Sequence, residues 1–69
     1  MKVNPGEKYK IFYNKNNINN KVIHIRAIVD DYQIICRHWS RYKQRWIYTI
    51  ENEYYFYLLN ESDSISKIK

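Results

Sequence analysis

The segment from residue 36 to residue 48, CRHWSRYKQRWIY, contains four cationic and four aromatic side chains and no acidic one. Arg and Lys side chains neutralise phosphate groups, and Trp and Tyr rings stack on unpaired bases. Trp, Tyr and Arg are also the residues that dominate hot spots between proteins. The segment therefore predicts a binding surface, either for a nucleic acid or for another protein.

The residues that could act as nucleophiles, bases or metal ligands do not form a convincing active site. Cys36 and His38 share one face of a strand, but no nearby acid orients the histidine, and an apolar setting raises the pKa of a thiol. Together with His24 they are too few for a closed zinc site, and a chain with one glycine has no glycine-rich phosphate loop. The acidic residues lie where solvated carboxylates are common, namely in a turn (Asp30 and Asp31) and at the end of a strand (Glu51 and Glu53). We predict a protein without enzymatic activity, metal or cofactor.

The charge of the chain is unevenly distributed. The formal net charge is +5, and residues 37–45 contribute four positive charges while residues 51–63 contribute four negative ones. This polarity argues against an acidic mimic of DNA and favours a polyanionic partner for the basic segment.

The length and composition indicate one small soluble domain, spanning 1–69, with a polar tail at 60–69 that is expected to fray. With 69 residues and 45% hydrophobic content, the chain has enough apolar surface for a small core. The single Cys36 excludes an intrachain disulfide, and the first residues, MKVNPGEK, lack the apolar run of a signal peptide. We therefore expect a cytoplasmic protein with no membrane partner.

The abundance of Ile, Lys, Asn and Tyr, which supply 35 of the 69 residues, indicates an AT-rich genome. A miniature domain in such a genome suggests, as a hypothesis, a phage or a mobile element. The genes that flank this one would test the idea.

Alternation and β-branched residues predict strands over 8–13, 21–29, 32–39 and 45–51. The Asn-rich segment 14–20 is expected to be a loop, and Asp30-Asp31 a tight turn. The aromatic run 54–59 fits a fifth strand and a helical turn about equally, and Ile65 and Ile68 could form a last short strand. The exposed half of that aromatic run could contact a protein.

Short strands separated by turns predict an all-β fold, and our first choice is a small antiparallel five-stranded SH3-like barrel. An OB-type barrel is less favoured because it usually needs longer strands and a helix. The alternative is a twisted β-meander with one short helical turn.

A hairpin register follows if the turns centre on Asp30-Asp31 and on Tyr42-Lys43. Opposed residue numbers then sum to 61 in the first hairpin and to 85 in the second. The aliphatic face is assigned to the core and comprises Ile23, Ile25, Ala27, Val29, Ile34, Cys36 and Ile47. The opposite face is assigned outward, because burying unpaired guanidinium groups is too costly, and it comprises His24, Arg26, Arg37, Trp39, Trp46 and Tyr48.

We predict a non-enzymatic binding module that binds DNA or RNA with low specificity through the basic, aromatic hairpin, with Lys10 extending the basic track. The alternative is a phage-encoded or mobile-element-encoded inhibitor or adaptor that uses the same hairpin on a host protein. A purely structural Trp pair with an Arg packed over it is a third interpretation. Both a monomer and a homodimer paired through edge strands are compatible with the sequence. The predicted binding residues are Arg26, Arg37, Trp39, Arg41, Tyr42, Lys43, Arg45, Trp46 and Tyr48.

Overall fold

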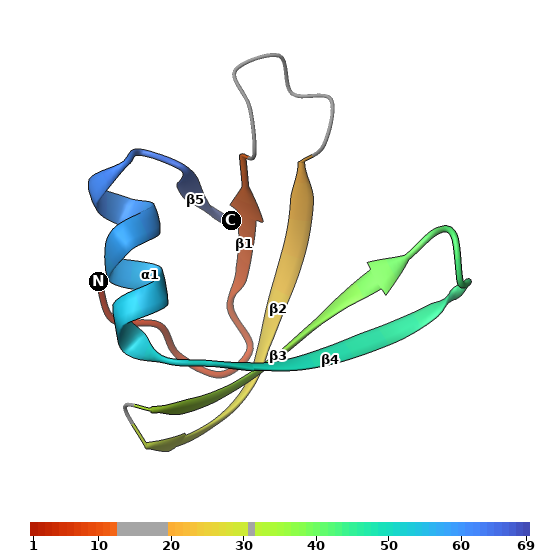
Figure 1. Cartoon of the computed structure of the whole chain (residues 1–69), viewed down its shortest axis with the longest axis horizontal. Coiled ribbons are helices and arrows are strands. Elements are labelled where there is room, and N and C mark those ends of the chain that lie inside the picture. The colour runs from red at the N-terminus through yellow and green to blue at the C-terminus, as the bar shows by residue number, and fades with distance from the viewer. Residues whose placement is uncertain (13–19, 31) are drawn as a thin grey trace.

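The computed structural model describes residues 1–12, 20–30 and 32–69, which form one antiparallel sheet and one helix (Figure 1). The strands are β1 (Lys8–Ile11), β2 (Lys21–Asp30), β3 (Gln33–Ser40), β4 (Arg45–Glu51) and β5 (Ile65–Ile68), and the helix α1 (Glu53–Glu61) lies between β4 and β5. The predicted all-β class is confirmed. Within the described ranges, no helix is long and apolar enough to cross a membrane.

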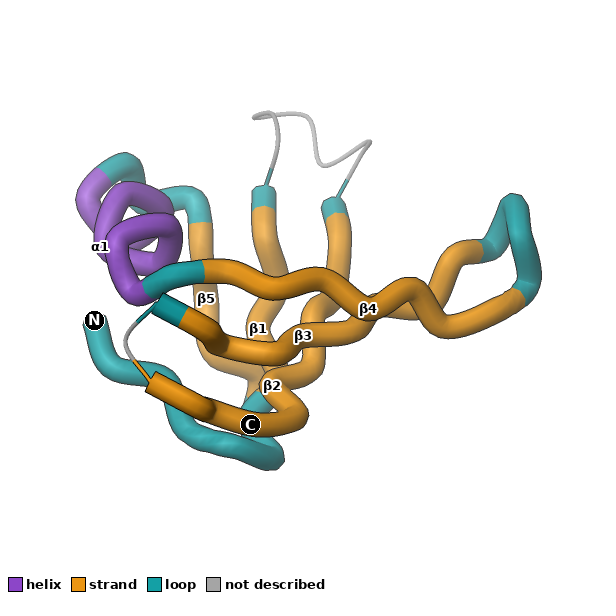
Figure 2. Tube along the Cα trace, turned by 60° about the horizontal axis from the view of Figure 1, so that its bottom comes forward, coloured by secondary structure: helices purple, strands orange, loops and turns teal. Residues whose placement is uncertain are grey.

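The strand order in the sheet is β4-β3-β2-β1-β5, so β4 and β5 form its two edges. Strand β2 connects the two halves: residues 21–24 pair with β1, and residues 24–30 pair with β3. Figure 2 shows how β1 and β5 run across the direction of β3 and β4. No pairing joins β4 to β5 in the described strands, so the sheet is open and the predicted closed barrel is not confirmed.

The predicted strands agree with the observed ones apart from their ends. The first strand ends at Ile11, two residues earlier than predicted, and the short last strand expected at Ile65 and Ile68 is present as β5. Tyr13, most of the predicted loop 14–20 and Asp31 lie outside the described residues.

The aromatic run 54–59 is helical and not a fifth strand. Asn52 caps the helix, because its side-chain oxygen accepts a 2.7 Å hydrogen bond from the backbone N–H of Tyr55. The helix buries one side chain completely, that of Phe56. Tyr54 and Tyr57 lie three residues apart on the helix, so both are exposed on the same side and their rings stack. Strand alternation would have placed them on opposite sides.

The core lies inside the bend of the sheet and is closed by α1. It contains residues from every strand except β4, together with Val3 of the amino-terminal segment and Phe56 of the helix. Its members are Val3, Tyr9, Ile11, Ile23, Ile25, Ile34, Cys36, Phe56 and Ile65. A core of this size leaves a net stability of roughly 3–5 kcal/mol in a chain this short, so contacts outside it also matter.

The predicted register of the second hairpin is confirmed over its whole length. Strands β3 and β4 pair without interruption from Ile34 opposite Glu51 to Ser40 opposite Arg45, and Trp39 lies opposite Trp46. The turn covers residues 41–44, with Gln44 in the left-handed region at a φ of 51°. The Ser40 hydroxyl accepts a 3.1 Å hydrogen bond from the backbone N–H of Lys43, which fixes the start of the turn.

The predicted register of the first hairpin is correct at one end and wrong near the turn. Ile25 pairs with Cys36 as expected, but Ala27 pairs with Ile35, because the register shifts between Ile25 and Ala27 and again beyond Ile28. A bulge adds a residue to one strand and increases its bend and twist. The prediction that Val29 faces the core is therefore wrong, since its side chain is 63% exposed.

A carboxylate ties the two ends of the chain to β1. Glu7 accepts hydrogen bonds from the Tyr9 hydroxyl at 2.8 Å and from the backbone N–H of Asn4 at 2.6 Å, and it forms a salt bridge with Lys67 of β5. The Lys67 contact, followed by the two hydrogen bonds, lowers the pKa of Glu7 from 4.5 to about 2. Burial and the bond to Glu7 raise the pKa of Tyr9 to about 12.

We predict that Glu7 contributes to stability at neutral pH and loses that contribution in acid. Since the pKa of Glu7 is lower in the folded chain than its ordinary value, the contribution is complete above pH 4.5 and disappears as the pH falls toward about 2. Urea denaturation across this range should show a smaller loss of stability for Glu7→Gln than for the wild type. Glu61→Gln, at an exposed helix position, is the control and should follow the wild type. Identical acid curves for Glu7→Gln and the wild type would contradict the role of this carboxylate.

Candidate nucleic-acid interface

The outer face of β2, β3 and β4 carries a cluster of aromatic and basic side chains on the side of the sheet away from the core. We call these residues the outer cluster. It consists of His24, Arg37, Trp39, Trp46 and Tyr48, and all but His24 are predicted binding residues that the structure brings together.

Trp46 is the centre of the outer cluster. Its ring meets the ring of His24 edge to face at 5.1 Å and the ring of Trp39 at 5.5 Å, measured between centroids. The guanidinium of Arg37 lies over it, with the central carbon 4.0 Å from the ring centroid. Such edge-to-face pairs and cation–π contacts each contribute about 0.5–1.5 kcal/mol. Because Arg37 covers a face of Trp46, this ring acts as a support and leaves stacking to its neighbours.

The exposed rings of the outer cluster are those of Trp39 and Tyr48. Trp39 is 50% exposed and Tyr48 58% exposed. The Tyr48 hydroxyl accepts a 3.2 Å hydrogen bond from Nη1 of Arg37, while Nε of Arg37 is buried without a partner in the described part of the chain. The guanidinium of Arg37 is therefore held in place by Trp46 and Tyr48.

Cationic groups converge on His24 from three strands. Burial lowers the pKa of its imidazole, and the positive charges of Lys8, Arg37 and Arg26 lower it further. Lys8 lies directly opposite His24 in the register of β1 and β2. Although the sequence places His24 on the outward face, the neighbouring Lys8 is not among the predicted site residues, since its position depends on the pairing of β1 with β2.

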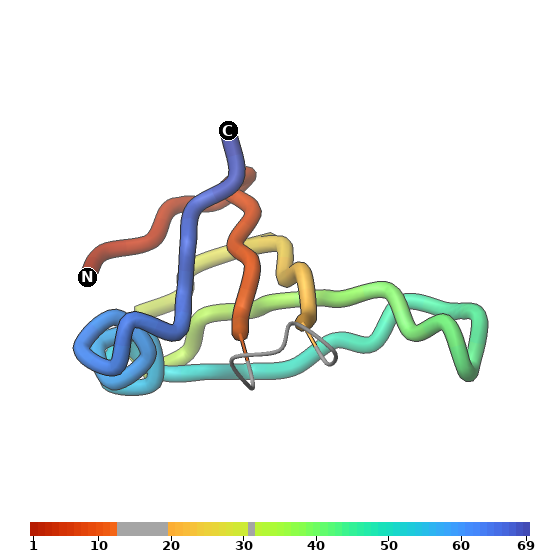
Figure 3. Tube along the Cα trace, turned by 90° about the horizontal axis from the view of Figure 1, so that it is seen from above, coloured from red at the N-terminus to blue at the C-terminus, as the bar shows by residue number. Residues whose placement is uncertain are grey.

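The turn between β3 and β4 projects from the body of the molecule (Figure 3). We call residues 41–45 the hairpin tip; it carries the predicted binding residues Arg41, Tyr42, Lys43 and Arg45, all exposed. Within the described residues, none of its three cations forms a salt bridge with a carboxylate. The tip therefore continues the positive surface beyond the outer cluster.

Arg26 and Lys10 lie at the margin of this surface. Arg26 is exposed at the bulge of β2, close enough for its charge to act on His24. The ammonium of Lys10 lies 5.7 Å from the ring centroid of Phe12, the residue that follows β1. Arg26 thus extends the basic surface, while Lys10 lies at its edge.

The inner face of β3 carries the two residues considered as a nucleophile and a base. The Cys36 thiol is buried, and burial together with the charge of Glu51 raises its pKa to about 11. Burial also lowers the pKa of His38. No group of three or more potential metal ligands comes together in residues 1–12, 20–30 and 32–69. The carboxylate of Asp30 accepts a hydrogen bond from the backbone N–H of Tyr32 and so serves the turn.

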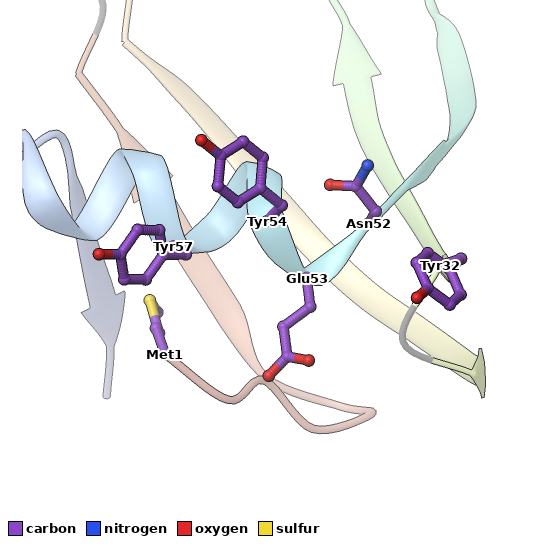
Figure 4. A pocket seen from close by; sticks show the side chains of 6 residues that line it. All are labelled: Met1, Tyr32, Asn52, Glu53, Tyr54 and Tyr57. Carbon is purple, nitrogen blue, oxygen red and sulfur yellow. The ribbon is translucent and has the colours of Figure 1, made fainter.

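An open cavity of about 370 Å³ lies at the other end of the molecule, beside α1 (Figure 4). Tyr54 and Tyr57 line it from the helix with stacked rings 6.0 Å apart, and Tyr32 lines it from the first hairpin. Met1, Asn52 and Glu53 complete the wall. The sequence offered no pattern for this cavity, because its residues come from three separate segments. Figure 1 shows that the hairpin tip points away from α1, so the cavity and the outer cluster are distinct surfaces.

Comparison with known proteins gives no relative for this chain: no family model, curated protein or solved structure matches it. Function is therefore inferred from the surface itself.

We predict that Trp46 and Trp39 differ in their contributions to stability, although they pair with each other. Trp46→Ala removes two aromatic contacts and the cation–π contact and should cost about 2 kcal/mol, whereas Trp39→Ala removes one aromatic contact and should cost about 1 kcal/mol. Urea denaturation followed by circular dichroism measures both. Equal losses would show that Trp46 is not the support of the cluster.

Proposed function

We propose that the protein binds single-stranded nucleic acid, without catalysis and with little sequence specificity, through the outer cluster and the hairpin tip. The observation that carries the proposal is the half-exposed ring of Trp39, which lies on the same sheet face as Arg37 and two residues from Arg41 of the hairpin tip. An exposed ring stacks on an unpaired base, which duplexes do not offer, and cations beside it neutralise the phosphates.

The side chains divide into two roles. Trp39 and Tyr48 stack on bases or pack against sugars. Arg37 is positioned by Trp46 and Tyr48. The phosphate contacts come from the basic groups of the tip and of β1 and β2, namely Lys8, Arg26, Arg41, Lys43 and Arg45. Because stacking on rings and contacts between cations and phosphates tolerate any base sequence, specificity is slight and affinity is micromolar or weaker.

We predict binding to a labelled oligothymidylate that weakens steeply with salt. Four to six phosphate contacts to a single strand give a slope of log affinity against log salt of about −3 to −4, measurable by fluorescence anisotropy between about 50 and about 200 mM salt. Trp39→Ala should weaken binding by about 1–3 kcal/mol at every salt concentration. Arg41→Glu should weaken it and make the slope shallower.

The matched control is Lys69→Glu, a charge reversal of the same size beyond β5, at the sheet edge opposite to β4. It should bind nearly as the wild type does. If Trp39→Ala and Arg41→Glu both bound normally while folded, the assigned surface would be wrong.

We further predict that binding takes up a proton at His24. In the free protein burial and then three nearby cations lower the pKa of His24, and a bound phosphate backbone raises it by favouring the imidazolium. Affinity therefore rises as the pH falls through the interval between the two pKa values, which is measurable between about pH 7.5 and about pH 5.5. His24→Gln should lose this pH dependence. His38→Gln, on the opposite face, should keep it.

A protein partner is the second candidate for the same surface, and the exposure of Tyr42 favours it. This side chain is 96% exposed at the end of a projecting hairpin and is flanked by Arg41 and Lys43, a composition typical of interface hot spots. An inhibitor or adaptor aimed at a host protein would use it in this way. Its binding would respond weakly to salt, in contrast to a phosphate clamp. No binding to oligonucleotides at low salt would favour this candidate.

We also propose that the fold is an open relative of the SH3-like barrel, supported by four meandering strands and a fifth that returns to pair with the first. Such barrels serve many functions, so this likeness carries no functional argument. We also propose a cytoplasmic location and an origin in a phage or mobile element, both on the basis of the sequence.

A further inference from the structure

In the described part of the chain, the outer edge of β4 pairs with no strand, is regular and lacks the usual devices that block strand addition. Edge strands expose a row of unpaired backbone groups and are normally protected by proline, bulges or central charges. Strand β4 has no proline, pairs with β3 without a bulge, and carries its charges at its two ends, on Arg45 and Glu51. At the opposite edge of the sheet, β5 is four residues long.

The sequence of β4, RWIYTIE, is complementary to itself in the antiparallel direction. A pairing centred on Tyr48 places Arg45 opposite Glu51 of a second copy, and the two-fold axis repeats this ion pair at the other end. A parallel pairing would set Arg45 against Arg45. The charges therefore favour one direction and one register.

The same register matches the two faces of the strand. On the outer face, Trp46 lies opposite Ile50 of the second copy, and the two Tyr48 side chains meet on the axis. Ile50 is 66% exposed and Tyr48 58% exposed in the single chain, so the pairing would cover apolar surface that water now contacts. Shifting the register by one residue would set outer-face residues against inner-face ones.

We propose that the protein forms a two-fold symmetric dimer in which β4 pairs antiparallel with β4 of a second copy. The two five-stranded sheets then become one continuous sheet, and each copy covers the exposed edge of the other. Two strands of seven residues form a small interface, so the dimer dissociates on dilution. The proposal does not depend on nucleic-acid binding, because it rests on the edge and the self-complementary sequence of β4. The two surfaces share Trp46 and Tyr48, which belong both to β4 and to the outer cluster.

Charge reversal tests this dimer by sedimentation of the full chain over a range of concentrations. Arg45→Glu and Glu51→Arg each set like charges against each other at both ends of the interface and should weaken dimerisation at least about tenfold. The double variant R45E/E51R restores opposite charges and should return the dissociation constant to within about threefold of the wild type. Glu61→Arg, on the exposed surface of α1, is the control and should dimerise normally.

A cross-link tests the register. In the proposed dimer, Tyr48→Cys places two thiols on the axis, with their Cα atoms about 4.5–5.5 Å apart, within reach of a disulfide. Ile50→Cys places them four residues out of register, about 13 Å apart, and should not cross-link. Cys36 is buried and does not compete.

A rapid disulfide with diamide for Tyr48→Cys alone supports the proposal. The proposal fails if the wild type is monomeric at all concentrations, if the two single reversals dimerise normally, or if both cysteine variants cross-link equally. Circular dichroism verifies that each variant is folded.

Discussion

Strand β2 is the element on which the rest of the structure depends, because it pairs with β1 through its first residues and with β3 through the remainder. The backbone bonds of Gly6 and Glu7 to Ile25 extend the first of these pairings toward the amino terminus. If β2 were straight, β1 and β3 would lie on either side of it in a flat sheet, which would enclose no core. The bulge near Arg26 bends β2, and the bend creates the hollow that the core side chains and α1 fill.

The bent sheet separates two kinds of side chain that one small interior could not hold together. The buried side chains of the inner face are aliphatic apart from Cys36 and Tyr9, and the Tyr9 hydroxyl reaches the carboxylate of Glu7 at the margin. The outer face holds an arginine and two tryptophans that contact one another instead of the core. With so small a core, the outer cluster contributes to stability as well as presenting a binding surface. The rings at its centre pack, and those at its margin remain available to a partner.

The sequence was sufficient to predict those parts of the fold that follow from alternation alone. The β3–β4 hairpin has no bulge, so opposed residues and faces, including Trp39 opposite Trp46, could be worked out from the turn. The β2–β3 register could not, because a bulge near Arg26 depends on tertiary packing and leaves no fixed sequence signal. The segment 54–59 satisfied two periodicities, and the cap at Asn52 settled it as a helix. The burial of Val3 was likewise unpredictable, because it lies in no regular element and enters the core through the path of the chain.

The buried thiol of Cys36 can report how often the sheet opens at β3. It lies on the central strand β3, between β2 and β4, with 1% of its surface exposed and a pKa of about 11. Alkylating reagents attack the thiolate, so at neutral pH the native chain is shielded both by packing and by protonation. The rate of alkylation therefore reports how often β3 separates from its neighbouring strands, with the native Cys36 as the reporter group.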